Sequence, residues 1–248
     1  MNIKTIKTKK FRPPKENLED VLQYLQNVQD GQVVAISSKV IAICQGRCIP
    51  VDKISKDKLV RQNARKVLVP WQKNRSDMEL TLVDDLLVES AGIDRSNGAD
   101  HYILMPKHPY GVARHIWHEI RKRNHISNVG VIITDSHSEP MRKGAVGMSL
   151  GSYGFYPVSN YSGTKDIFGS KLNGAGANIE DALAVAAVFS MGEGNETTPI
   201  AVIDDISSVK FYRRMGVVRQ RLLAKVTRRR DVYGPLLDSE LWQINKKG

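Results

Sequence analysis

The sequence predicts an α+β (mixed α/β) fold, and three observations support this class. The short runs 129–135 and 200–205 are rich in branched apolar residues, as buried strands are. Two segments, 112–123 and 179–191, have the spacing or composition of helices. These helices and strands do not alternate regularly, which argues against a doubly wound nucleotide-binding fold. A chain of 248 residues is long enough for one large domain or two modest ones, and we expect two lobes.

Two helices are predicted in the N-terminal third. Asn17 can cap a helix whose apolar residues follow helical spacing, and Gly31 can end it. Ser55 begins a second helical pattern that continues to Val67.

Extended segments accompany these helices. Residues 32–43, QVVAISSKVIAI, are rich in β-branched residues and predict a strand that leads into a helix or a second strand. Residues 80–88, LTLVDDLLV, predict an extended segment that leads to the turn 89–97, ESAGIDRSN.

The C-terminal half continues the mixed pattern. In the helix predicted over 112–123, Ile116, Trp117 and Ile120 should face inward. A glycine-rich stretch follows the buried strand 129–135, and Asn178 can cap an alanine-rich helix from Ile179 to about Met191.

The charge balance predicts an anionic partner. Lys and Arg number 37 against 26 Asp and Glu, which gives a net charge of +11. Six basic residues precede the first acid, Glu16, and nine lie between Lys210 and Arg230 without an acid among them. Such blocks are either solvated faces or surfaces that collect phosphates from nucleotides, nucleic acid or a polyanionic metabolite.

Several classes of protein are disfavoured. No apolar stretch approaches the roughly 18 to 20 residues of a membrane helix, and the N-terminus lacks the apolar block of a secretory signal, so we expect a cytoplasmic protein. The pair Cys44 and Cys48 is a poor zinc signal, and His115 and His118 lack a third ligand. The common phosphate-loop, dinucleotide-binding and serine-hydrolase motifs are missing from the sequence.

Three acids are candidates for chemistry. Asp135 ends a predicted strand and precedes Ser136, a position that suits a metal ligand but also an ordinary turn or cap. Glu193 lies at the end of a predicted helix, where negative charge opposes the helix dipole unless a cation is near; the alternative is a solvated loop residue. Asp94 lies in the turn 89–97, whose composition also fits a surface turn.

Several motifs follow one another along the chain: SKVIAICQGR (38–47), AGID (91–94) with Ser96 and Asn97, VGVIITDS (129–136), GTKD (163–166) with Gly169, Asp181, and MGEG (191–194). In this order, from about Phe11 to about Asp204, they resemble the coenzyme F420-0:L-glutamate ligases, γ-glutamyl ligases that elongate a deazaflavin coenzyme.

The resemblance implies a fold and a site. It implies a single family unit over 1–248, made of two interleaved α/β lobes in an intertwined homodimer, with about 206–248 as a basic C-terminal extension. It also implies two Mg²⁺ or Mn²⁺ ions, GTP or ATP as co-substrate, and L-glutamate with an anionic small-molecule acceptor. The implied metal ligands are Asp94, Asp135, Ser136 and Glu193. The implied nucleotide-binding residues are Phe11, Arg12, Pro13, Pro14, Ser38, Lys39, Asn97, Met191, Gly192 and Gly194.

Two departures from the family pattern bear on substrate choice. Ile43 stands where the family usually has a lysine that faces phosphate, a loss that Lys39 could replace. Ser138 and Glu139 replace the family's glycine-arginine, and the reversed charge should alter acceptor or nucleotide choice.

Three hypotheses therefore stand at the level of sequence. The first is a nucleotide-dependent ligase that acts on the deazaflavin coenzyme through an acyl phosphate. The second is a γ-glutamyl ligase with another acceptor, such as a folate, or another amine. The third is a catalytically silent relative that binds nucleotide or RNA through the basic blocks.

Overall fold

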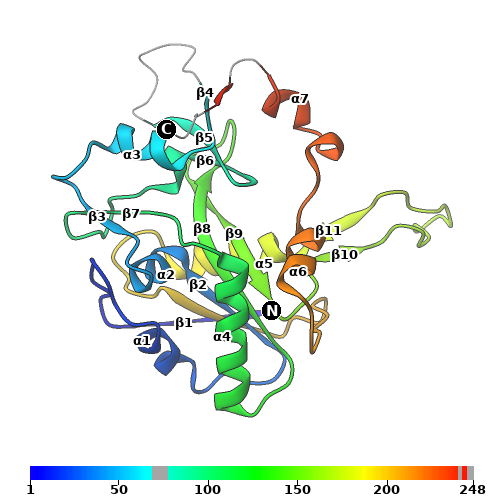
Figure 1. Cartoon of the computed structure of the whole chain (residues 1–248). Helices are drawn as coiled ribbons and strands as arrows, with labels where there is room; N and C mark the ends of the chain where they lie inside the picture. The colour runs from blue at the N-terminus through cyan, green and yellow to red at the C-terminus, as the bar shows by residue number, and fades with distance from the viewer. Residues whose placement is uncertain (69–77, 240–241, 245–248) are drawn as a thin grey trace.

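The computed structural model describes residues 1–68, 78–239 and 242–244, which form a larger and a smaller β-sheet with separate cores (Figure 1). The larger sheet has the strand order β1-β12-β2-β8-β9. Only β2 and β8 are parallel, and the other neighbouring strands of this sheet are antiparallel. The strands are β1 (Asn2–Ile6), β2 (Gln32–Ser37), β8 (Val129–Ser138), β9 (Ala145–Tyr153) and β12 (Ile200–Asp204).

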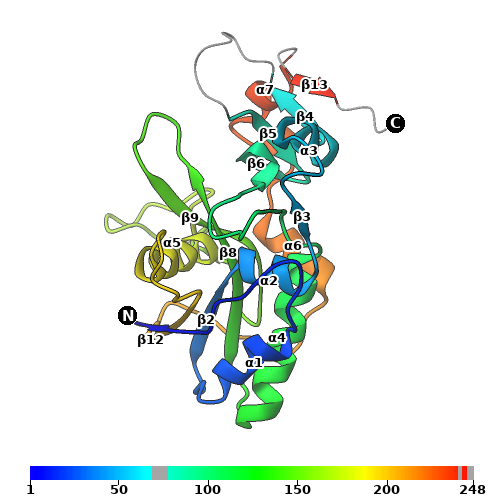
Figure 2. The ribbon, with the colours of Figure 1, turned by 90° about the vertical axis from the view of Figure 1, so that its left-hand side faces the viewer.

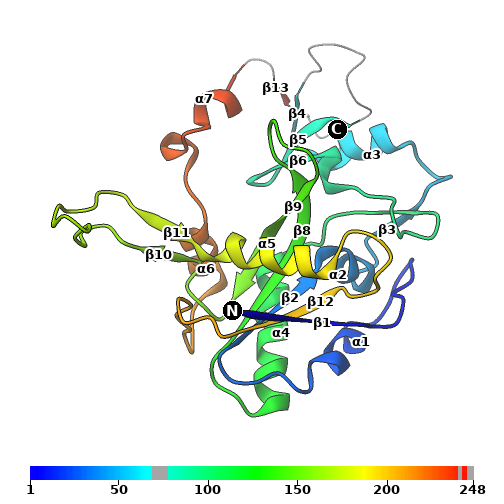
Figure 3. The same ribbon diagram turned by 180° about the vertical axis from the view of Figure 1, so that it is seen from behind.

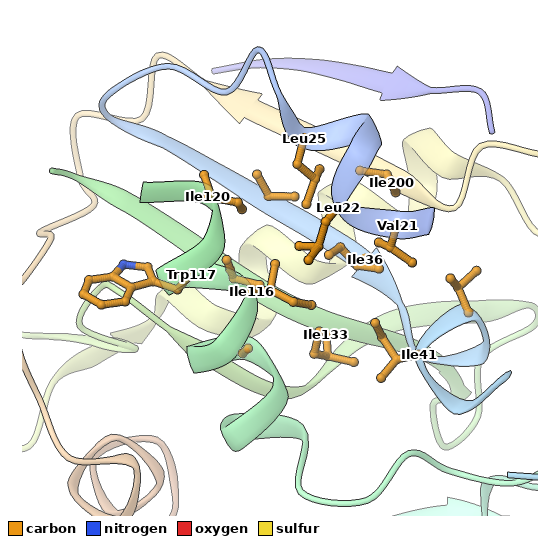
Figure 4. Close-up of a cluster of buried hydrophobic side chains, with 14 of the residues drawn as sticks. Val21, Leu22, Leu25, Ile36, Ile41, Ile116, Trp117, Ile120, Ile133 and Ile200 are labelled. Carbon is orange, nitrogen blue, oxygen red and sulfur yellow. The ribbon is translucent and has the colours of Figure 1, made fainter. Parts of the chain in front are cut away.

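Helices cover both faces of the larger sheet, because its central strands carry apolar side chains on both sides. Helices α1 (Glu19–Leu22) and α4 (Pro109–Asn124) pack on one face, and α5 (Ile179–Met191) packs on the other (Figures 2 and 3). In β2, Val34 and Ile36 face α4, whereas Val33 and Ala35 face α5. Figure 4 shows side chains of the core between the sheet and α1 and α4, with Trp117 at one edge.

The smaller sheet has the order β13-β4-β5-β6 and its own small cores. Its elements are α3 (Lys56–Asn63), β4 (Lys66–Leu68), β5 (Leu80–Val83), β6 (Leu86–Glu89), α7 (Gly234–Leu237) and β13 (Trp242–Ile244). The remaining pieces are η1 (Gln23–Leu25), α2 (Ser38–Cys44), β3 (Cys48–Pro50), η2 (Ser90–Gly92), β7 (His101–Ile103), β10 (Val158–Asn160), β11 (Gly176–Asn178), α6 (Val217–Ala224) and η3 (Arg228–Arg230). Strands β10 and β11 form the base of an arm that projects from the body (Figure 1).

The α+β class is confirmed, and so are most of the predicted elements. Residues 32–43 form a strand that leads into a helix, and the helix around Trp117 buries the three predicted side chains. Asn178 caps α5, since its side chain accepts a 3.0 Å hydrogen bond from the backbone N–H of Asp181.

Other predictions are wrong in part. The helix expected from Asn17 to Gly31 consists of only α1 and η1, because the chain tightens into a 3-10 turn and leaves the helix before Val28. Val67 belongs to β4 rather than to α3, since it pairs with Thr81 of the smaller sheet. Residues 80–88 form a hairpin rather than one extended segment.

The residues after β12 span both sheets. Gln220 of α6 is fully buried, and its Nε2 donates to Ser152 Oγ at 2.9 Å and to the Phe155 carbonyl at 3.1 Å. Farther along, β13 pairs with β4 of the smaller sheet. The basic C-terminal segment is therefore built into the fold over its described residues, while residues 240–241 and 245–248 of the expected extension lie outside them. None of the helices in the described ranges combines the length and apolar character required to span a membrane.

Candidate functional site

A cavity of about 420 Å³ lies beside the carboxyl ends of the parallel strands β2 and β8. Ligands commonly bind at this edge of a sheet, because neighbouring parallel strands deliver their loops to the same place. Segments far apart in the sequence meet here, namely 8–11, 37–43, 94–97, 134–136, 188 and 191–199.

Asp135 is the first residue of β8 beyond the stretch that pairs with β2. Burial raises the pKa of Asp135 to about 6, although the backbone N–H of Ser136 and the nearby Lys39 charge favour the ionised form. The side chain of Ser38 also forms a hydrogen bond with this carboxylate. The positive charge near Asp135 therefore does not offset the cost of ionising it in a buried place. A bound cation would offset that cost.

Asp94 reaches the same cavity from a turn that the smaller sheet holds in place. Ser90, Ala91 and Gly92 all have positive φ angles, from 49° to 63°, a conformation that side chains other than glycine rarely adopt. The buried hydroxyl of Thr81 fixes this turn, because it accepts from the Ala91 N–H at 2.9 Å. A strained turn that is held this firmly is typical of a functional site.

Lys39 pairs with Asp94 across the cavity. Its Nζ lies 2.7 Å from Asp94 Oδ2, with side chains that are 27% and 50% exposed. Burial on its own would raise the pKa of Asp94, but hydrogen bonds from Lys39 and Ser96 outweigh it and lower the pKa to about 2. The two aspartates thus differ, because a lysine neutralises Asp94 directly whereas Asp135 is only near that charge.

Glu193 approaches from the end of α5. Gly192 ends this helix with φ of 80°, which turns the chain toward the cavity. Ser136 Oγ donates to Glu193 Oε2 at 3.2 Å, and Asn97 Nδ2 donates to the Gly194 carbonyl at 3.0 Å. These two hydrogen bonds connect the α5 terminus to β8 and to the Asp94 turn.

The donor set fits a divalent metal ion of the magnesium type. Four acids line the cavity (Asp94, Asp135, Glu193 and Glu196) against three lysines (Lys9, Lys10 and Lys39). Lys9 is paired elsewhere, at 2.9 Å from Glu16 and 3.0 Å from Asp20, so the acids are in excess. Within the described part of the chain, no three His, Cys, Asp or Glu side chains form a ready metal cluster. Mg²⁺ does not require one, because it usually takes one or two protein carboxylates and completes its shell with water and phosphates.

The structure brings most of the predicted nucleotide-binding residues together. Phe11, Lys39, Asn97, Met191, Gly192 and Gly194 line the cavity, and the buried Ser38 lies against Asp135. Arg12, Pro13 and Pro14 follow the lining segment 8–11 but do not line the cavity themselves. The Arg12 N–H instead donates to Glu16 Oε1 at 3.0 Å.

Three charged residues of the lining, Lys9, Lys10 and Glu196, were not predicted as site residues from the sequence. Lys10 precedes Phe11, and Glu196 lies two residues after the MGEG motif, where Glu196 Oε2 accepts from the Gly194 N–H at 2.9 Å. The one sequence feature that could have pointed to these residues is that each lies within two positions of a predicted site residue, Phe11 or Gly194.

The two departures occupy different places. Ile43 lines the cavity one helical turn after Lys39, on the same face of α2. Glu139 lines a second cavity of about 300 Å³ instead, and its carboxylate lies 3.4 Å from His137 Nε2. The reversed charge at Glu139 is therefore not part of the cavity that holds the four acids.

Comparison with known proteins gives one consistent result. The family model described as F420-0:Gamma-glutamyl ligase matches residues 5–205. A protein of Methanocaldococcus jannaschii named coenzyme F420:L-glutamate ligase is 32% identical over 192 residues, which cover 71% of this chain and 76% of the relative. Relatives with the same name are each 28% identical, in Methanopyrus kandleri over 76% of this chain and 81% of the relative, and in Methanosarcina mazei over 84% and 91%.

Proposed function

The chain belongs to the F420-0:gamma-glutamyl ligase family, and we propose that it joins L-glutamate in γ-linkage to coenzyme F420-0 or a related acidic acceptor. The reaction would consume GTP or ATP and form a C–N bond. The observation that carries the proposal is the convergence of Asp94, Asp135, Ser136 and Glu193 on one cavity.

The cavity suits a nucleotide bound together with divalent ions. Its excess of acids would repel a bare polyphosphate, so the phosphates would enter with cations that the same acids hold. We propose that Asp94, Asp135, Ser136 and Glu193 hold two Mg²⁺ or Mn²⁺ ions. When bound, such ions neutralise charge that develops on the transferring phosphoryl group.

The residues of the chain orient the reactants. Lys10 and Lys39 would attract the phosphates, and the Asn97 contact to Gly194 would hold two walls of the nucleotide site in register. In the first step an acceptor carboxylate oxygen attacks the γ-phosphorus, which releases the nucleoside diphosphate and leaves an acyl phosphate. In the second step the glutamate amine attacks the acyl carbon, loses a proton and expels inorganic phosphate, so that an amide bond forms.

Phosphate release would test the reaction class. We expect purified protein to release phosphate from GTP or ATP only when Mg²⁺ or Mn²⁺, glutamate and an acidic acceptor are all present. A panel that includes F420-0 and a folate would identify the acceptor.

Binding of RNA that weakens steeply with salt, without any turnover, would instead support the silent relative. Sedimentation at several concentrations would test the homodimer, which the family suggests.

Metal affinity should depend on pH in one direction. Because the pKa of Asp135 is about 6, protons compete with the metal at lower pH, while Asp94 with a pKa of about 2 stays ionised. We expect the affinity for Mn²⁺ to be constant above pH 7 and to fall about tenfold per pH unit well below 6. Titration with Mn²⁺ alone, followed by electron paramagnetic resonance, avoids the titration of a nucleotide's terminal phosphate. Equal affinities at pH 5 and pH 8 would contradict the role of Asp135.

A further inference from the structure

The ammonium of Lys39 occupies a small ring of oxygen atoms. Its Nζ lies 2.7 Å from Asp94 Oδ2, 2.9 Å from Ser96 Oγ and 3.1 Å from the Ser96 carbonyl oxygen. A lysine ammonium has three N–H donors, so these three acceptors use all of them. The cation of this lysine is thus held by a carboxylate, a hydroxyl and a carbonyl, the oxygen ligands that hard divalent ions also prefer.

The ring is organised independently of the lysine. The Ser96 N–H donates to Asp94 Oδ1 at 2.8 Å, and the Ser96 hydroxyl contacts Asp94 Oδ2. The turn before it is anchored through Thr81 in the core of the smaller sheet, whereas Lys39 arrives from α2 beside the larger sheet. Asp94 and Ser96 would therefore keep their arrangement if the lysine moved away.

Lys39 is also the one lysine of α2, and it lines the cavity where nucleotide phosphates would bind. Ile43, one turn later on the same face, is apolar, and Lys9 is bound to Glu16 and Asp20. A lysine whose three donors are all used by Asp94 and Ser96 has none left for a phosphate oxygen. Engagement of phosphate would require Lys39 to leave the ring, and its departure would leave Asp94 without its counter-ion.

We propose that Lys39 is an electrostatic placeholder, which holds the Asp94–Ser96 oxygens in the metal-free protein, yields them to a divalent ion, and then binds the nucleotide phosphates. This inference rests on the proposed function, because it needs a divalent ion and a nucleotide in this cavity. Lys39 and the metal ion compete for Asp94, so Lys39 lowers the affinity for the metal ion. A bound metal ion displaces Lys39 and frees it for phosphate, so the metal ion raises the affinity for the nucleotide. Linkage requires this second effect to be reciprocal.

Lys39→Met tests the competition, since methionine fills similar space without charge. In the absence of nucleotide, we expect Mn²⁺ to bind this variant about three- to tenfold more tightly than the wild type, because a partly exposed ion pair no longer opposes it. At saturating Mn²⁺, a non-hydrolysable GTP analogue should bind about tenfold more weakly, because a phosphate contact is lost. Opposite shifts in the two affinities are the signature of the placeholder.

Two further variants serve as controls. Lys10→Met removes the same charge from the same cavity without touching Asp94, so its Mn²⁺ affinity should change less than that of Lys39→Met. Lys39→Arg keeps the cation and should keep Mn²⁺ affinity near that of the wild type.

The outcomes separate this inference from the proposed function. Equal Mn²⁺ affinities for the wild type and Lys39→Met, with metal-dependent GTP analogue binding intact in the wild type, overturn the placeholder alone. Equal tightening by Lys10→Met overturns it too, because the effect would then come from net charge. Absence of Mn²⁺ binding to both proteins, with or without the GTP analogue, overturns the placeholder together with the proposed metal site.

Discussion

Asp135→Asn should abolish metal-dependent nucleotide binding and yet make the metal-free protein more stable. Removal of a carboxylate that binds a metal ion directly should cost more than the 10- to 100-fold typical of supporting residues. We therefore expect at least a 100-fold loss of affinity for a GTP analogue in the presence of Mn²⁺. Calorimetric titration with and without Mn²⁺ measures this loss.

The gain in stability follows from the pKa of Asp135. Folding raises this pKa from 3.8 to about 6, so protonated Asp135 is compatible with the folded state and ionised Asp135 opposes it. The stability associated with the protonated form is fully present below pH 3.8 and is lost as pH rises through 6. At pH 7.5 the ionised side chain opposes folding by about 1 to 2 kcal/mol, after allowance for its partial exposure. Asp135→Asn should raise the free energy of unfolding by that amount at pH 7.5 and by little near pH 4, as urea denaturation would show.

Asp30→Asn is a matched control with the same change of charge. Asp30 accepts hydrogen bonds from the backbone N–H groups of Ser127 and Asn128 at 2.8 and 2.7 Å, and the Asn128 contact is the main cause of its lowered pKa. This variant should lose stability at pH 7.5 and retain metal-dependent nucleotide binding. Unchanged nucleotide affinity in Asp135→Asn would remove Asp135 from the site.

Gly147→Ala should damage both the fold and the site. An added Cβ would lie 2.6 Å from the Ala184 carbonyl oxygen and 2.9 Å from Val185 Cα, both backbone atoms of α5. Because a backbone cannot rotate aside as a side chain does, α5 would have to move away from β9. We expect a loss of about 3 kcal/mol or more in the free energy of unfolding.

The same displacement should reach the cavity. Gly147 pairs with Ser136 across β8 and β9, and Ser136 is hydrogen-bonded to Glu193 beyond the end of α5. The variant should therefore bind a metal–nucleotide complex more weakly even below its melting temperature. Gly111→Ala in α4 is the control: its added Cβ would lie 3.7 Å from the Cβ of His108, the residue before the helix, and alanine should be neutral or stabilising by up to about 1 kcal/mol. A melting temperature of Gly147→Ala equal to that of the wild type would contradict this packing.

Local pattern explains which elements the sequence predicts. The run 129–133 is continuously apolar because β8 is buried on both faces there, and the Asn178 cap predicts the start of α5. Strand β9 gives no such signal, since its glycines weaken strand propensity. Gly147 is needed where α5 approaches, and Gly151 where Tyr110 of α4 approaches, and both are long-range contacts.

The residues of the site likewise divide into those that local sequence pattern predicts and those that depend on long-range contacts. Asp94, Asp135 and Glu193 can be picked out from the sequence because each lies at a local feature that the sequence predicts: a turn, a strand end and a helix end. The positions of Lys10 and Glu196 depend on how two loops close over the cavity, which local pattern does not encode. The ring around Lys39 likewise joins residues 57 positions apart, and only the tertiary structure reveals it.

Mass spectrometry of the acceptor would decide whether this protein joins glutamate to the deazaflavin. Purified protein would be incubated with F420-0, L-glutamate, GTP or ATP, and Mn²⁺, and the deazaflavin products would be weighed. We predict a product that is heavier by one or more glutamyl residues, formed only when all components are present and missing with Asp135→Asn. An unchanged deazaflavin mass with both nucleotides, from protein that binds the metal–nucleotide complex, would contradict ligation to this coenzyme.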